Sequence, residues 1–246
     1  MLKPFTFVLL TFFLILAFNS NSFAKKKKIL VFSKTAGFHH SSIPAGIMAI
    51  QRLAMENKFI ADTTTDATKI NPSNLKQYAA VIFLNTTGDI FNEQQEKAFE
   101  QYIRSGGGFV GVHAATDTEF DWPWYGKLAG AYFVKHPAQQ VAELNVLNRK
   151  TISTAHLPEV WKRKDEWYNF KDISTDLKVL ININENSYSG GSNGANHPMA
   201  WYHDFDGGRA FYTGLGHTEE SYTDPLFLQH LLGGIQYAMG LKRMEH

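Results

Sequence analysis

The sequence of 246 residues contains no cysteine. This absence excludes disulfide bonds, thiolate metal ligands, a cysteine nucleophile and any lipid anchor that requires a cysteine. An excess of one charge is also lacking, because 24 Lys and Arg residues stand against 23 Asp and Glu residues. A surface balanced in this way provides no electrostatic basis for binding nucleic acid or an anionic membrane. The fold must therefore depend on its core, and the partner we expect is a small molecule.

The one long apolar run extends from Phe5 to Phe18. Its length, about 14 residues, is below the roughly 20 residues that a membrane-spanning helix needs. The run follows Lys3 and precedes the small residues Ser22 and Ala24, a pattern typical of a cleavable secretory signal. We therefore predict a signal peptide at 1–24, cleavage after Ala24, and export to the periplasm or the medium. Residues 25–246 are then expected to form one α/β domain with no attachment to the membrane.

Apolar runs and helical repeats alternate along residues 29–239. The expected elements are, in chain order, a strand at 29–32, a helix beginning at Pro44, strands at 59–61 and 79–84, a helix from Asn92 to Gly106, strands at 109–112, 141–147 and 178–183, a hairpin of 199–203 with 209–213, and a helix at 225–239. This order predicts a mostly parallel sheet with right-handed crossovers and an antiparallel edge. Ligands bind such sheets outside the carboxyl ends of the strands.

Histidines are concentrated in the loops that follow the predicted strands. Five of the ten lie in loops that contain glycine, asparagine or serine: His39, His40, His113, His197 and His217. An imidazole can bind a metal, transfer a proton or donate a hydrogen bond to a sugar hydroxyl. Neighbouring side chains of an extended segment point in opposite directions, so we expect only one of the first pair, His39, in a site. His136, before Pro137, is expected to be structural.

Acidic and aromatic residues add to these loops. Asp117 lies four residues beyond His113, where it either joins His113 on one helical face or caps a helix. Glu166 precedes Trp167 and Tyr168, and a carboxyl group beside an indole ring suits a general acid. The aromatic rings offer flat faces for stacking on a sugar, although each tryptophan can equally belong to the core.

Several ordered motifs resemble those of the trehalose-utilisation (ThuA-like) family. They are Gly37-Phe38-His39-His40-Ser41, Asn85-Thr86-Thr87-Gly88-Asp89, Gly106 to Ala115, Asn196-His197-Pro198 and Gly214-Leu215-Gly216-His217. The resemblance covers residues 28–240 and implies a flavodoxin-like, doubly wound fold of the class I glutamine amidotransferase type, with helices on both faces. In that larger group the turn after the equivalent strand carries a catalytic cysteine. Here the turn carries His113, so cysteine-dependent amidotransferase chemistry is excluded.

The link of the resembling family to sugar use implies a carbohydrate ligand. The first hypothesis is an enzyme of the hydrolase or lyase type acting on a glycoside or keto-sugar. Its expected catalytic residues are His113, Asp117, Glu166 and His217. Its expected substrate-binding residues are His39, Asn85, Thr86, Trp167, Tyr168 and His197. The alternatives are a sugar-binding protein without catalysis and a partner-binding scaffold on a retired enzyme fold.

A divalent metal such as zinc is a further expectation for the same loops. Its candidate ligands are His39, His113, His197 and His217, with Asp117 as an additional carboxylate. The sequence lacks the paired-histidine spacing of a zinc-binding helix, so the ligand pattern by itself leaves the presence and identity of a metal open.

Overall fold

The structure, a computed structural model, describes residues 26–245, and the predicted signal peptide lies outside them. Its main feature is a nine-stranded mixed sheet in the order β2-β1-β3-β4-β11-β10-β9-β6-β7. The strands of its parallel half are β2 (Ile60–Thr64), β1 (Lys28–Phe32), β3 (Ala80–Leu84), β4 (Gly108–Val112) and β11 (Gly208–Thr213). Strands β3 and β4 are buried along their whole length, as their continuous apolar sequences predict. The parallel order 2-1-3-4-5 is that of a flavodoxin-like sheet, so the predicted fold class is confirmed.

The other half of the sheet is antiparallel. It consists of β10 (Pro198–Phe205), β9 (Lys178–Ile183), β6 (Gln140–Val146) and β7 (Val160–Asp165). A separate pair, β5 (Tyr132–Lys135) with β8 (Asn169–Lys171), lies beside it. Strands β5, β7 and β8 were not expected from the sequence. The sequence of β7, VWKRKD, carries mostly charged residues because this strand forms an edge of the sheet.

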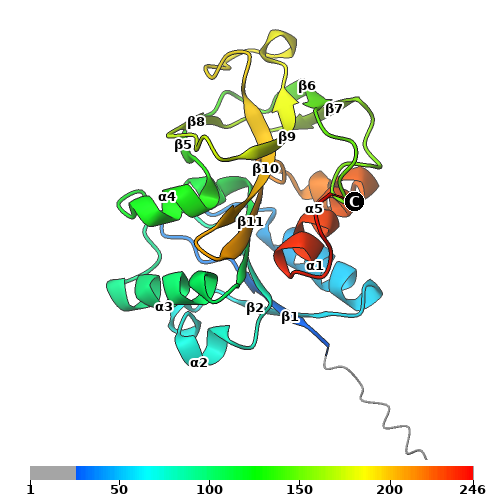
Figure 1. Cartoon of the computed structure of the whole chain (residues 1–246). Coiled ribbons are helices and arrows are strands. Elements are labelled where there is room, and N and C mark those ends of the chain that lie inside the picture. Colours follow the sequence, from blue (N-terminus) through cyan, green and yellow to red (C-terminus); the bar gives the residue numbers. More distant parts are fainter. Residues whose placement is uncertain (1–25, 246) are drawn as a thin grey trace, which may run out of the picture.

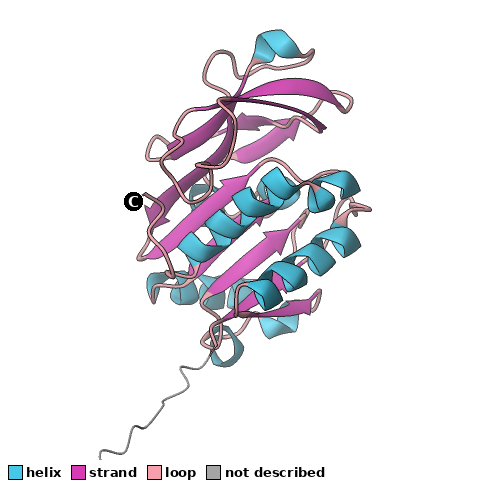
Figure 2. Cartoon of the chain, turned by 90° about the vertical axis from the view of Figure 1, so that its right-hand side faces the viewer, coloured by secondary structure: helices cyan, strands magenta, loops and turns pink. Residues whose placement is uncertain are grey.

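Helices cover both faces of the parallel half (Figure 1). On one face lie α1 (Ile43–Glu56) and α5 (Pro225–Ala238), and Figure 2 looks onto this face. On the other lie α2 (Pro72–Leu75), α3 (Glu93–Arg104) and α4 (Pro123–Ala129). Four short 3₁₀ segments complete the order: η1 (Ala67–Lys69), η2 (His113–Thr116), η3 (Glu185–Ser187) and η4 (Glu219–Thr223). Within residues 26–245, no helix has the length and apolar character needed to cross a bilayer.

Local sequence explains where the helices begin. Asn92 caps α3 by accepting the N–H groups of Gln94 and Gln95, and the Gln95 side chain accepts the N–H of Asn92 in return. Asp224 caps α5 by accepting the N–H of Leu226, directly before Pro225. These starts place the loops that precede α3 and α5 after the carboxyl ends of β3 and β11.

Candidate functional site

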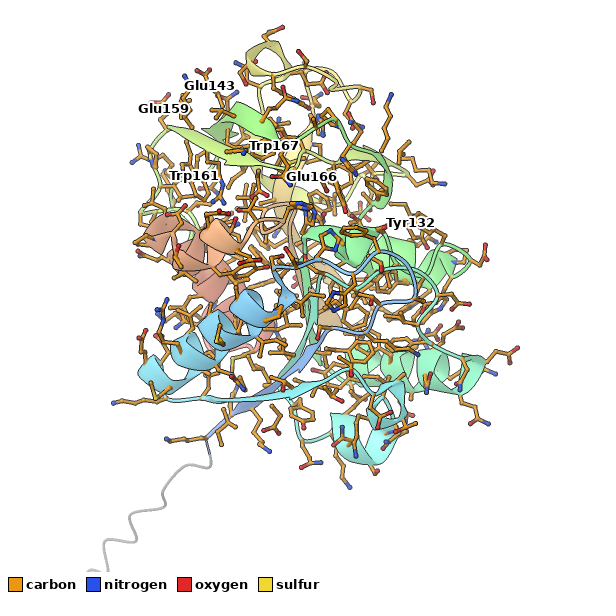
Figure 3. All side chains as sticks on the ribbon, turned by 180° about the vertical axis from the view of Figure 1, so that it is seen from behind. Tyr132, Glu143, Glu159, Trp161, Glu166 and Trp167 are labelled. Carbon is orange, nitrogen blue, oxygen red and sulfur yellow. The ribbon has the colours of Figure 1, made fainter. Side chains whose placement is uncertain are left out.

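Four side chains converge where the carboxyl ends of the parallel strands meet β7: His40, His113, Glu166 and His217. Each offers a nitrogen or oxygen atom, and these atoms all lie within 4.8 Å of one another. His40 precedes α1, His113 follows β4, Glu166 follows β7 and His217 follows β11. Figure 3 shows Glu166 near the centre of the molecule. We call this group the His–Glu cluster.

The backbone at the end of β4 turns sharply to direct His113 into the cluster. His113 has a φ of +48°, a left-handed conformation that is uncommon for residues other than glycine. Two positions earlier, a Cβ atom on Gly111 would lie 2.9 Å from the ring of Tyr212 and 3.2 Å from the Ala115 side chain. The strand-to-helix turn therefore requires the small residue that the sequence provides.

Hydrogen bonds fix the orientation of the His113 ring. Its Nδ1 lies 3.0 Å from the carbonyl oxygen of Gly214, which can only accept, so Nδ1 carries the proton. Its Nε2 lies 3.1 Å from His217 Nδ1 and 3.4 Å from Glu166 Oε2. In neutral His113 this Nε2 therefore presents a lone pair to the other members of the cluster.

Glu166 contacts histidines through both of its oxygens. Oε2 lies 3.0 Å from His217 Nδ1, and Oε1 lies 3.1 Å from Nδ1 of His136. Burial disfavours the charged carboxylate, but the proximity of His113 and His217 outweighs burial and holds the pKa of Glu166 well below its usual range. The cluster thus contains an ionised carboxylate at neutral pH.

His40 packs perpendicular to two other imidazoles. Its ring centroid lies 5.1 Å from those of His113 and His217, with interplanar angles of 88° and 84°. Burial, followed by the proximity of His113 and His217, lowers the pKa of His40 to about 3, so the ring is neutral. Its Nδ1 is buried and has no hydrogen-bond partner among the described residues.

Asp165 fixes the loop that carries His217. Its fully buried carboxylate accepts the backbone N–H groups of Gly216 and His217, each at 3.1 Å. It also accepts a hydrogen bond from Arg163 at 3.1 Å and from the Ser221 hydroxyl at 3.3 Å. The end of β7 is in this way attached to the loop after β11.

Two residues that the sequence places in the site lie outside the cluster, His39 and Asp117. His39 is exposed and lies outside the cluster, whereas its neighbour His40 is buried within it, so the structure brings His40 and not His39 to the other three side chains. Among the described residues 26–245, no hydrogen bond or ion pair joins the Asp117 side chain to His113. The segment after β4 is a 3₁₀ helix with about three residues per turn, so a residue four positions on does not share the face of His113.

Two residues predicted to bind substrate, His197 and Trp167, are buried and form hydrogen bonds within the protein. Both ring nitrogens of the fully buried His197 are engaged, Nε2 with the carbonyl oxygen of Tyr168 and Nδ1 with Glu185, each at 2.7 Å. Trp167 is also fully buried, and its indole N–H donates to the carbonyl oxygen of Gln140. Neither side chain belongs to the cluster or lines the cleft beside it.

The remaining residues predicted to bind substrate, Asn85, Thr86 and Tyr168, are buried. Asn85 donates to the Ser42 hydroxyl, and Thr86 shares a hydrogen bond with Thr118, all of them buried. They connect the loops after the strands. Tyr168 contacts the cluster, because its ring packs beside that of His113 with the two ring centroids 4.2 Å apart.

The sequence interpretation did not select His40, Asp165, His136 or Phe38. The signal for His40 was its place two residues before the Ser42 N-cap, where a loop faces the carboxyl ends of the strands. Phe38 is 67% exposed, and its ring packs edge-on against His40 at 4.9 Å. It is therefore the exposed aromatic ring beside the cluster, a role for which tryptophans had been considered.

A polar cleft of about 500 Å³ reaches the cluster at His217. Its lining consists of Ser41, Gln139, Lys164, His217, Thr218, Glu219 and Glu220. A second cleft, of about 590 Å³, is lined by residues including Tyr202, Arg209 and Tyr237, at the amino end of β11, and contains no member of the cluster. The first cleft lies where open α/β sheets bind ligands, so we regard it as the approach to the site.

Comparisons with known proteins agree with the fold. The family model described as ThuA, trehalose utilisation, matches residues 28–238. No curated relative matches the chain. A ThuA-like protein of Bacteroides uniformis ATCC 8492 is 25% identical, with a TM-score of 0.74, over 89% of this chain and 94% of that one. A ThuA-like protein of Parabacteroides merdae ATCC 43184 is 20% identical, with the same TM-score, over 89% and 91%.

A more distant likeness of fold is to the β-galactosidase of Bacillus circulans sp. alkalophilus. It is 14% identical, with a TM-score of 0.58, over 87% of this chain but 31% of that chain. At this identity the likeness concerns the fold alone.

Proposed function

Since this chain belongs to the ThuA (trehalose utilisation) family, we propose that it is an exported enzyme acting on a glycoside or keto-sugar at the His–Glu cluster. The observation that carries the proposal is the contact between the ionised Glu166 and His217, 3.0 Å apart at the inner end of a polar cleft. A carboxylate paired with an imidazole is an arrangement for proton transfer. The cleft volume of about 500 Å³ lies within the range of small-molecule sites.

The side chains around the cleft favour a ligand rich in hydroxyl groups. Ser41, Gln139 and Thr218 offer neutral donors and acceptors, and Lys164 and Glu219 add charged ones. Phe38, exposed beside His40, supplies an apolar face of the sort that packs on a sugar ring. The combination suits a carbohydrate better than an apolar or a polyanionic ligand.

The cluster can act on such a ligand by two routes. As a hydrogen-bonded pair, Glu166 and His217 can transfer a proton to or from a glycosidic oxygen, a water or a carbon beside a carbonyl group. With a bound divalent cation, the same groups can hold an ion that polarises a carbonyl or hydroxyl oxygen. Both routes correspond to chemistry of the hydrolase or lyase type.

The test is turnover of a panel of glycosides and their keto derivatives by the mature protein, followed by NMR. We expect product from at least one keto-glycoside or glycoside, and a loss of about 10²–10⁴-fold in kcat/KM for Glu166→Gln, which keeps the shape of the side chain. His39→Ala is the matched control and should keep the wild-type rate, because His39 is exposed and outside the cluster. Equal rates for Glu166→Gln and wild type would contradict the assignment of the site.

A sugar-binding protein without catalysis is the second candidate, favoured by the exposed ring of Phe38 and the polar cleft. It predicts saturable binding of a sugar by calorimetry with no product. If the protein neither bound nor converted any member of the panel, both candidates would be rejected.

A further inference from the structure

We propose that His40, His113, Glu166 and His217 together bind one divalent first-row transition-metal ion, with Zn²⁺ as the reference ion. The site deepens the proposed function, because it supplies the second of the two routes. Its evidence is the geometry of the cluster, however, and it does not depend on which sugar the protein uses.

The distances between the candidate ligand atoms are those of a coordination shell. A tetrahedral ion with bonds of about 2.0–2.2 Å holds its ligand atoms about 3.3–3.6 Å apart. Here His113 Nε2 lies 3.4 Å from Glu166 Oε2 and 3.1 Å from His217 Nδ1, and these two lie 3.0 Å apart. The triangle needs to expand by only a few tenths of an ångström to accept an ion.

Hydrogen bonding alone does not satisfy this triangle. His113 Nδ1 donates its proton to the carbonyl oxygen of Gly214, so neutral His113 presents a lone pair at Nε2, and Glu166 Oε2, 3.4 Å away, is a second acceptor. His217 Nδ1 has at most one proton in the neutral ring and can supply only one of them. A cation at the centre would satisfy all three atoms at once.

His40 provides an independent observation. Its side chain is 3% exposed, and its Nδ1 has no hydrogen-bond partner in the part of the chain that the structure describes. An unpaired buried nitrogen normally costs free energy. His40 also has an atom within 4.8 Å of those of the other three residues, so its ring is in reach of the same ion.

The surrounding contacts are those of supported metal ligands. Metal-binding histidines commonly donate their second ring N–H to a carbonyl oxygen or carboxylate, as His113 does to Gly214. His136 contacts Oε1 of Glu166 at 3.1 Å, which leaves Oε2 for the ion. Both contacts orient their ligands before an ion arrives.

The ligand set selects the class of ion. Three imidazoles and one carboxylate suit Zn²⁺, Fe²⁺, Co²⁺ or Ni²⁺, whereas Mg²⁺ and Ca²⁺ prefer shells made of oxygen. The chain has no cysteine to provide thiolate ligands. His217 keeps 15% of its side-chain surface exposed at the cleft, so a ligand oxygen can approach from that side as a further donor.

The experiment is calorimetric titration of untagged, chelator-treated mature protein with Zn²⁺, and with Mg²⁺ for comparison. We expect one equivalent of Zn²⁺, no comparable binding of Mg²⁺, and bound metal in freshly purified protein by mass spectrometry. His217→Ala and Glu166→Gln should each weaken Zn²⁺ binding by about 100-fold or more, and His136→Ala by about 10–100-fold. His39→Ala is the control and should bind as the wild type does. Circular dichroism establishes that each variant is folded.

Less than a tenth of an equivalent of bound Zn²⁺ would overturn the metal site, as would unchanged affinity in folded His217→Ala and Glu166→Gln. Equal binding of Mg²⁺ would overturn the imidazole shell. Substitution by Co²⁺ gives a second measure, because visible absorption that is lost in His113→Asn places the ion at this cluster; Asn tolerates the positive φ of this position. The titration contains no sugar, so a loaded protein without turnover would reject the proposed function and leave the metal site standing.

Discussion

The carboxylate of Asp165 accepts the main-chain N–H of His217 at 3.1 Å, although the two residues are 52 positions apart. Through the same side chain it accepts the N–H of Gly216 and a hydrogen bond from Arg163. This contact connects the antiparallel half of the sheet, which supplies Glu166, to the parallel half, which supplies His113 and His217. The cluster therefore depends on how two halves of one sheet are joined.

Replacement of Asp165 should destabilise the protein. Asp165→Asn removes the charge that faces the buried Arg163, and we expect a loss of about 3 kcal/mol in the free energy of unfolding, measured with urea. Asp224→Asn is the control, since it removes the more exposed partner of Arg163 and keeps an asparagine cap on α5; about 1 kcal/mol or less is expected. Equal losses of unfolding free energy in both variants would show that Asp165 contributes no more to stability than Asp224 does.

Glu119 should make stability depend on pH. Burial, with smaller contributions from Asp89 and Glu96, raises its pKa from 4.5 to about 7, although it accepts the N–H groups of Ile90 and Phe91. The native state then holds a proton that the unfolded state loses near pH 4.5. The contribution of Glu119 to stability is therefore largest below that pH and falls as pH rises toward 7, by about 1–3 kcal/mol.

Glu119→Gln tests this dependence, because an amide keeps an acceptor oxygen and cannot ionise. Unfolding by urea between pH 5 and pH 8 should show a shallower fall in stability for the variant than for the wild type. Parallel curves for the two proteins would assign the pH dependence to other groups.

His197 should contribute to stability and not to substrate binding. In His197→Ala the carbonyl oxygen of Tyr168 and the carboxylate of Glu185 lose their buried partner, at a cost of about 2–4 kcal/mol. KM for a sugar substrate should stay within about twofold of the wild-type value, because the His197 side chain is bonded within the protein and not to the substrate. A raised KM in a variant of normal stability would restore His197 to the binding site.

Phe38 should bind sugar without supporting the fold. Its ring is 67% exposed, so Phe38→Ala should change the free energy of unfolding by about 0.5 kcal/mol or less. Loss of a stacking face should raise Kd or KM about 3–10-fold. Met48→Ala, at a similarly exposed position on α1, serves as the control and should change neither quantity.

Export should leave a mature protein that begins at Lys25. Mass spectrometry of exported material is expected to give the mass of residues 25–246, because the apolar run at 5–18 followed by Ser22 and Ala24 is a cleavage pattern. Recovery of exported protein that still begins with Met1 would contradict this prediction.

By itself the sequence determined the parallel half of the fold and the general position of the site. The buried runs of β1, β3 and β4, with helices between them, permit few arrangements other than a doubly wound sheet. His113 and His217 were selected because they follow predicted strands, whose carboxyl ends meet at one edge, and Glu166 was selected because it precedes an indole ring. The lack of cysteine determined which nucleophile and ligands are absent.

Only the tertiary structure decided between neighbours and between roles. The choice of His40 over His39 depends on how the loop before α1 turns, and the separation of Asp117 from His113 depends on a 3₁₀ helix in place of an α-helix. β7 could not be expected from its charged sequence, because an edge strand gains its place from backbone pairing with β6 and not from burial of its own side chains. Contacts across long separations in the chain, such as that of Asp165 with His217, have no local signal, and they bring the cluster together.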